Sequence, residues 1–152
     1  MPRGVYSIDL KVPIEKVWRF VGSIDNWAPL VPGYIEHKII SDKESTWAFK
    51  GDFGFMKKTI KLKVDITEWN EPVLVTFDLT GLSDNFAGNG YFKAEKRNGS
   101  STRMTGCLDI TAYGIKGPVA NSILKNFVPE TTEELTTAVA KKILEIENAS
   151  LI

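Results

Sequence analysis

The chain has 152 residues, with 19 basic and 19 acidic side chains that leave a formal net charge of zero. Hydrophobic residues make up 43% of it, enough for a core and too many for a disordered chain. These numbers predict one domain over residues 1–152 and exclude the basic surface of a nucleic-acid-binding protein. No stretch approaches the roughly 20 apolar residues of a membrane span. The chain does not open on an apolar signal segment, so we expect a cytoplasmic protein.

The first part of the chain predicts one strand and two short helices. Residues 5–12 alternate between polar and apolar side chains, which is typical of a strand. Pro13 suits the first turn of a helix, and we expect that helix over residues 14–21. A second short helix is expected around residues 27–31, where Pro32-Gly33 stops it and turns the chain into a sheet.

Six strands are expected to follow in series. Their predicted ranges are residues 34–40, 45–53, 57–69, 73–79, 86–96 and 102–113. In the third of these strands, Ile60, Leu62 and Val64 alternate with polar residues, so one face should be buried. The Asn98-Gly99 pair is a strong signal for a hairpin between the last two. Short turns between consecutive strands favour an antiparallel sheet.

One long amphipathic helix is expected over residues 117–148. Its apolar stripe is predicted to consist of Val119, Ile123, Phe127, Leu135, Val139, Ile143 and Ile146. Pro129 predicts a kink or break near residues 126–128, and makes residues 125–131 the expected mobile gate of a pocket. The fold class is therefore α+β, with a seven-stranded antiparallel sheet wrapped around the long C-terminal helix and two short helices after the first strand.

Three stretches of the sequence carry a family resemblance. They are Val12-Pro13 with Val17-Trp18, Trp27 and residues 30–33; residues 51–58 with the strand to Trp69 and Pro72; and residues 86–90. On these residues the chain resembles the START-like (SRPBCC) superfamily of helix-grip proteins, and more narrowly the carbon monoxide dehydrogenase G family. It departs from that family at Tyr34, where a cysteine is frequent, and at Pro129. The resemblance implies an apolar or amphipathic ligand held between sheet and helix. The narrower family also implies an accessory role beside a molybdenum-containing dehydrogenase, with membrane association.

The apolar faces of the predicted strands and helix should converge on one space. The residues predicted to bind a ligand there are Trp47, Phe49, Val75, Phe77, Leu79, Phe92, Met104, Leu108, Ile110, Val119, Ile123 and Phe127. Small residues on the same face, such as Gly88, Gly90 and Gly106, favour empty volume. A space filled by its own side chains is the alternative, because both arrangements are apolar and point inward.

The sequence offers little for catalysis. His37 is the only histidine and Cys107 the only cysteine, and neither has an obvious partner at useful spacing. We predict that both are structural, and we predict no catalytic residue, metal site or cofactor. Gly88-Asn89-Gly90 precedes a strand rather than a helix, so a bend in the sheet is favoured over a phosphate site.

The loop at residues 53–58 is a candidate surface for a peripheral membrane or a partner protein. It combines Phe53, Phe55 and Met56 with Lys57 and Lys58, although the aromatic rings would instead pack inward if they flank strand ends. The favoured function is non-catalytic binding of a hydrophobic small molecule such as a lipid, isoprenoid or quinone. The alternatives are a polyketide cyclase or dehydratase-like enzyme, and a membrane-docking accessory factor of a molybdenum-containing dehydrogenase.

Overall fold

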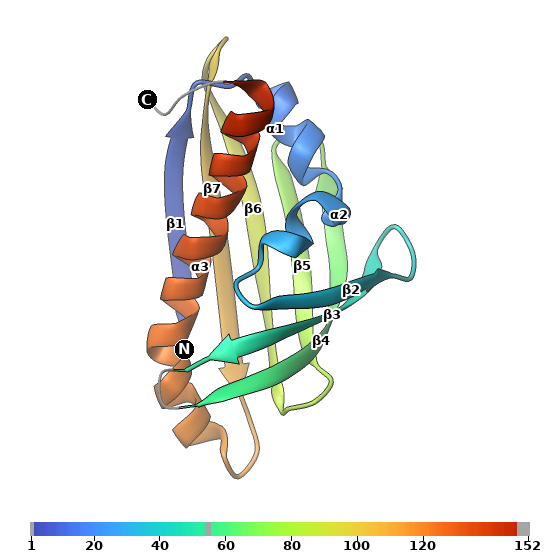
Figure 1. The fold of residues 1–152 in the computed structure, drawn as a ribbon, viewed down its shortest axis with the longest axis vertical. Coiled ribbons are helices and arrows are strands. Elements are labelled where there is room, and N and C mark those ends of the chain that lie inside the picture. Colours follow the sequence, from blue (N-terminus) through green and yellow to red (C-terminus); the bar gives the residue numbers. More distant parts are fainter. Residues whose placement is uncertain (1, 54–55, 149–152) are drawn as a thin grey trace.

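The computed structural model describes residues 2–53 and 56–148 (Figure 1). The chain runs through β1 (Arg3–Leu10), α1 (Ile14–Val21), α2 (Ile24–Trp27) and a short 3-10 helix, η1 (Ala28–Leu30). It continues through β2 (Tyr34–Ile39), β3 (Glu44–Asp52), β4 (Lys57–Asn70), β5 (Leu74–Gly81), β6 (Phe86–Asn98), β7 (Ser101–Ala112) and α3 (Gly117–Glu147). The predicted elements are confirmed, although the second helical segment begins three residues earlier than expected and divides into α2 and η1.

The seven strands form one antiparallel sheet in the order β1-β7-β6-β5-β4-β3-β2. Consecutive strands from β2 to β7 pair as neighbours, and β7 then pairs on its other side with β1. The sheet curls so that β2, β3 and β4 come round toward the lower part of α3 (Figure 1). This is the α+β helix-grip arrangement that the order of elements predicts.

The interior below α2 is filled by aromatic rings. The ring centroid of Trp27 lies 5.3 Å from that of Trp47 and 6.2 Å from that of Phe77. The Trp27 indole Nε1–H donates to the Val21 carbonyl over 3.0 Å, so its one polar atom is satisfied. This end of the sheet is therefore a packed core rather than a container.

One face of α3 packs closely on β1 and β7. We call this the sheet face of α3; its buried residues include Val128, Thr132, Thr136, Val139 and Ile143. Glycine makes the close approach possible, because a Cβ at Gly4 would lie only 2.5 Å from Thr132 Oγ1, and a Cβ at Gly106 would overlap Thr136.

The predicted single stripe on this helix is wrong, because its first part, as far as Phe127, lies on the opposite side of the helix from its later part around Val139 and Ile143. Val119 is 69% exposed and Ile146 is 59% exposed, so neither faces the sheet. The contact is instead made in part by Thr132 and Thr136, which a hydrophobic pattern does not single out. Their hydroxyls donate to the carbonyls of Val128 and Thr132 over 2.7 Å, which lets polar side chains be buried here.

The predicted break at Pro129 is absent, because α3 runs continuously from Gly117 to Glu147. Proline has no N–H to donate to the Lys125 carbonyl, so one helical bond is lost. The turn after it is held on the sheet by Thr132, and the Pro129 backbone itself lies against Gly4. Tertiary packing therefore offsets the local cost of the proline. The gate expected at residues 125–131 stays a prediction.

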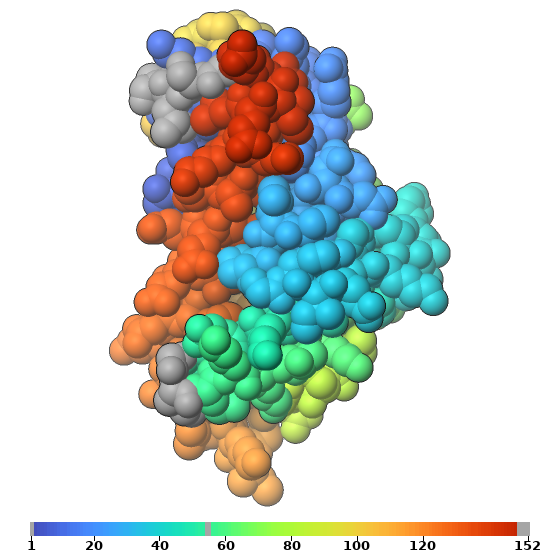
Figure 2. All heavy atoms as spheres, in the orientation of Figure 1, coloured from blue at the N-terminus to red at the C-terminus, as the bar shows by residue number. Residues whose placement is uncertain are grey.

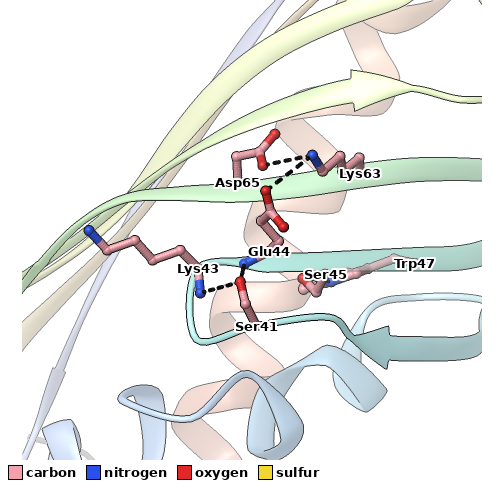
Figure 3. A network of polar contacts seen from close by, with 7 residues as sticks. All are labelled: Ser41, Lys43, Glu44, Ser45, Trp47, Lys63 and Asp65. Carbon is pink, nitrogen blue, oxygen red and sulfur yellow. Dashed lines mark hydrogen bonds and ion pairs between the residues drawn. The ribbon is translucent and has the colours of Figure 1, made fainter.

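The turn between β2 and β3 is fixed by a polar network (Figure 3). The Ser41 hydroxyl accepts hydrogen bonds from the backbone N–H groups of Lys43 and Glu44, over 3.3 and 3.1 Å. On the neighbouring strand, Lys63 Nζ lies 3.6 Å from Glu44 and 3.3 Å from Asp65. The hydrogen bond to Asp65 raises the pKa of Lys63. This end of the β3–β4 hairpin is thus tied down, and its other end approaches α3.

Candidate functional site

A cavity of about 930 Å³ lies between α3 and the free end of the β3–β4 hairpin. We call it the large cavity; it is open to solvent on one side. Its walls come from the corner at Pro32 and Gly33, from the hairpin and from α3. The hairpin contributes Lys50, Asp52, Phe53 and Lys57, and α3 contributes Ile123, Asn126, Phe127, Glu130, Thr131 and Glu134.

The Pro32-Gly33 corner builds one edge of the large cavity. Gly33 has a φ of +78°, in the left-handed region that glycine adopts without strain. A Cβ at this position would also collide with the Lys50 carbonyl oxygen. The Lys50 N–H donates to the Gly33 carbonyl over 2.7 Å, so the corner is fastened to the end of β3. The backbone conformation therefore requires glycine at position 33, and the Pro32-Gly33 pair forms part of the cavity wall.

Two aromatic rings join the hairpin to the helix across this space. The centroids of Phe53 and Phe127 are 4.7 Å apart, with the ring planes tilted by 45°. Both side chains are half-buried, as is Ile123 beside them. Apolar surface thus remains open to the cavity, where a bound apolar molecule would cover it.

The large cavity and the sheet use opposite faces of α3. At about 100° per residue, Ile123, Phe127, Glu130 and Glu134 lie half a turn away from the sheet face. We call this second set the hairpin face of α3. The helix is therefore packed on one side and flanked by open volume on the other.

A second, small cavity of about 40 Å³ lies on the inner side of α3. Phe77, Phe92 and Leu108 line it from the sheet, and Leu135 and Val139 line it from the helix. Its volume is enough for one or a few waters and far too small for a lipid. The space that the apolar faces were expected to enclose is thus almost filled by side chains.

The twelve residues predicted to bind a ligand separate into five groups. Ile123 and Phe127 line the large cavity, whereas Phe77, Phe92 and Leu108 line the small one. Trp47, Val75, Leu79 and Met104 are buried in the core, and Phe49 and Ile110 are half-buried against it. Val119 lines neither cavity and points to solvent.

Sequence reasoning missed the polar part of the large cavity. Lys50, Glu130 and Glu134 belong to its walls, and alternation alone gave no reason to select exposed charges. The rim of the large cavity therefore carries acidic and basic side chains, which the residues predicted to bind a ligand did not include. The Pro32-Gly33 corner was the one available signal, since it marks where β2 leaves the helices.

The loop at residues 53–58 has a mixed placement. Phe53 packs toward α3 and Lys57 lines the large cavity, while Met56 is exposed. Lys58 forms an ion pair with Asp84. Phe55 lies outside the described residues.

His37 has partners, contrary to the isolation that its sequence surroundings suggested. Its Nε2 lies 2.6 Å from Asp25 Oδ1 and its Nδ1 lies 2.7 Å from Tyr34 Oη. The imidazole is only 12% exposed. Asp25 comes from α2, twelve positions away, so spacing within β2 gave no sign of it. The contact ties α2 to the edge strand of the sheet.

The described residues offer few other chemical groups. Within residues 2–53 and 56–148, no three His, Cys, Asp or Glu side chains gather as metal ligands would. Cys107 is buried on β7. No helix in this part of the chain is both long and apolar enough to cross a membrane.

Comparison with known proteins agrees with the observed fold. One family model matches residues 1–145. The aromatase/cyclase Zhui from Streptomyces sp. R1128 has a TM-score of 0.73 at 12% identity, over 93% of this chain and 92% of that one. TTHA0849 from Thermus thermophilus has a TM-score of 0.75 at 16% identity, over 95% and 99%.

A third structure, the di-domain aromatase/cyclase StfQ of the steffimycin pathway, has a TM-score of 0.70 at 8% identity. The match covers 97% of this chain and 52% of StfQ. No curated protein matches the chain by sequence. The chain therefore has the same fold as these solved structures, with the helix-grip arrangement described above. At these identities the likeness to the solved structures shows the fold and not an activity.

Proposed function

We propose that this chain is a binding protein for a hydrophobic small molecule such as a lipid, isoprenoid or quinone, held in the large cavity. The observation that carries the proposal is a cavity of about 930 Å³ with half-buried Ile123 and Phe127 on one wall and Phe53 on the other. Ligand sites are commonly about 300–1,000 Å³ and mostly apolar, with a few polar groups.

The composition of the walls favours a molecule with one polar end. Burial against Ile123 and the two rings would contribute about 25 cal/mol per Å² of apolar surface, before the cost of ordering. The charged side chains of Lys50, Lys57, Glu130 and Glu134 are exposed and keep the rim hydrated. A polar end group placed there would lose little hydration, whereas the same group deep in the site would be costly.

The narrower kinship with the carbon monoxide dehydrogenase G family is part of the proposal. It is supported by the Pro32-Gly33 corner, which forms an edge of the large cavity. An accessory role beside a molybdenum-containing dehydrogenase would fit a carrier of a redox-active quinone. Replacing the lipid probe by a quinone in the binding experiment below tests this choice of ligand.

An enzyme of the polyketide cyclase type is the second candidate. Two of the similar structures are aromatase/cyclases, and the Asp25–His37–Tyr34 hydrogen bonds orient an imidazole as acid–base catalysis requires. His37 lines neither cavity, which favours the binding function. Under the binding account, His37→Gln leaves ligand affinity unchanged; a bound molecule that the wild type converts and His37→Gln does not would make the chain an enzyme.

Native mass spectrometry of protein purified without detergent tests the proposal. We expect an additional lipid-like mass on the folded chain, and displacement of a naphthalene-sulfonate probe by fatty acid or quinone. Ile123→Trp should reduce the bound fraction because the larger ring fills the cavity. Ile146→Trp, on the same helix but 59% exposed, is the matched control and should bind as the wild type does. The absence of both a bound mass and probe binding would refute the proposal.

A further inference from the structure

The two edges of the sheet differ in how they are protected against pairing with another chain. β2, at one edge, carries Lys38, and its register with β3 shifts near its start. His37 of this strand is joined to Asp25 of α2, and Figure 2 shows residues 24–39 as one continuous surface. Bulges, lysines and a covering segment are the devices by which proteins keep an edge strand from pairing with other chains. The β2 edge is therefore protected.

The opposite edge strand, β1, lacks these devices. Its register with β7 is unbroken from Arg3 to Leu10, and this stretch holds neither lysine nor proline. β1 is the last strand of the sheet on this side (Figure 1), and in the part of the chain that the structure describes no strand pairs with its outer edge. The Val5 side chain is 52% exposed there. A long, regular and unpaired edge is a template for another strand.

Alternate residues of β1 present their backbone groups to the outer edge. The Ile110 N–H donates to the Pro2 carbonyl over 3.0 Å, which fixes which residues of β1 bond to β7. Because bonding residues alternate in an antiparallel ladder, the even-numbered residues of β1 face β7. The N–H and C=O groups of the odd-numbered residues, from Arg3 to Asp9, therefore point away from β7 and toward any strand that joins the edge.

The sequence of β1 is complementary to itself in one antiparallel register. When β1 pairs with β1 of a second copy in this register, Arg3 lies opposite Asp9, and Val5 lies opposite Ser7. All four residues have outward backbone groups, so the hydrogen bonds of the ladder can form in full. Moving the strands by two residues would place Val5 opposite Asp9, or would leave Asp9 outside the paired strands.

We propose that the chain forms a symmetric dimer through its β1 strands, which joins the two sheets into one. Arg3 is exposed and, among the described residues, forms no ion pair. In the dimer it meets Asp9 of the other copy, a carboxylate that accepts two hydrogen bonds from Arg103 and has lone pairs left for a second guanidinium. Opposite charges that face each other across two strands favour this register.

The position of α3 allows the two sheets to meet. This helix lies over β1 and β7, since Gly4 faces Thr132 and Gly106 faces Thr136. The two α3 helices of a dimer would therefore run side by side at about twice the strand spacing, or about 10 Å. Helices in proteins pack at about this distance. Below them, Tyr6 meets its counterpart at the two-fold axis as a cross-strand aromatic pair.

Sedimentation equilibrium of the whole chain tests the dimer. We expect a monomer–dimer equilibrium in the wild type. Val5→Pro should weaken association at least about tenfold, because proline removes an outward N–H and no bond to β7. Ile39→Pro on β2 is the matched control. The Ile40 N–H donates to Glu44 of β3, so the Ile39 N–H also points outward, and this variant should associate as the wild type does.

The charge pair gives a second test. Arg3→Glu should weaken association about fivefold, since the new carboxylate would face Asp9 of the other copy. Lys43→Glu makes the same change of charge between β2 and β3 and should leave association unchanged. Circular dichroism shows that each variant is folded. Equal weakening by Arg3→Glu and Lys43→Glu would mean that net charge, and not this contact, controls association.

Amide hydrogen exchange at two protein concentrations locates the interface. The Val5 and Ser7 N–H groups should become protected only where the dimer forms, whereas those of Tyr6 and Ile8, which face β7, should be protected at both concentrations. The proposal is overturned if the chain remains monomeric at the higher concentration. It is also overturned by a dimer that Val5→Pro leaves intact, or in which the Val5 and Ser7 amides exchange as fast as in the monomer.

Discussion

The two faces of α3 differ in packing, because one is closed against the sheet and the other borders the large cavity. The sheet face uses Thr132 and Thr136 opposite Gly4 and Gly106, so that backbone and backbone come close and only the small cavity of about 40 Å³ is left. The hairpin face carries larger apolar side chains, Ile123 and Phe127, and leaves them half-buried beside about 930 Å³ of open space. Glycine and threonine therefore mark the closest contact of the helix with the sheet, while Ile123 and Phe127 lie on the side that is open. This is the reverse of what hydrophobicity alone would suggest.

The largest effect on stability should come from replacing one isoleucine on each face of α3 by alanine and comparing the two losses. Ile143 is 1% exposed, so Ile143→Ala should lower the free energy of unfolding by about 2–5 kcal/mol. Ile123→Ala should cost about 1 kcal/mol or less, because its side chain is already partly hydrated. Urea unfolding of both variants measures the difference. Equal losses would mean that the hairpin face is also part of the core.

Adding one methyl group between helix and sheet should have the next largest effect. Gly106→Ala would place a Cβ against Thr136 Oγ1, and we expect a loss of about 1–3 kcal/mol from overpacking. Gly99→Ala is the control, because nothing lies within 4 Å of a Cβ at that position. Combining Gly106→Ala with Thr136→Ala should recover part of the loss. If the double variant is no more stable than the single one, the close approach is not what limits this contact.

Ligand affinity should respond in the opposite pattern from stability. Phe127→Ala removes a ring from the wall of the large cavity and its contact with Phe53, and should weaken probe binding about tenfold. Val139→Ala, on the sheet face, should leave affinity unchanged under conditions in which the variant is folded. Fluorescence titration with the naphthalene-sulfonate probe measures the affinity of each variant. A greater loss of affinity for Val139→Ala would place the ligand in the small cavity, which Val139 lines.

The smallest effect concerns the strands behind the sheet face. Asp9 Oδ1 accepts a hydrogen bond of 2.9 Å from Arg103 Nε, and this bond lowers the pKa of Asp9. The pair should therefore contribute stability above the unfolded pKa of Asp9, and lose it as the pH falls through the lower folded value. The contribution is small because the pair is partly exposed. Unfolding midpoints of wild type and Asp9→Asn should converge in acid, and a difference that is constant with pH would exclude this linkage.

Local patterns account for what the sequence predicted well. The strands were recognisable because alternation and turns such as Asn98-Gly99 act over a few residues, and α1 was predicted at its observed bounds. The site was harder, because it depends on how far the β3–β4 hairpin reaches around α3 and on which face of the helix meets the sheet. The threonines of the sheet face have no apolar signal, and His37 meets Asp25 only after α2 folds back. A periodic pattern within one segment gives no information about its contacts with segments that are distant in the sequence.

The most direct test of the account follows the isoleucine methyl groups by nuclear magnetic resonance during titration with the naphthalene-sulfonate probe. The Ile123 δ1 methyl, on the wall of the large cavity, should shift until the probe saturates its site. The chemical shift of the Ile143 δ1 methyl, which is buried on the sheet face, should not change. An unmoved Ile123 signal, or a shift at Ile143 that matches it, would contradict the claim that the open face of α3 holds the ligand.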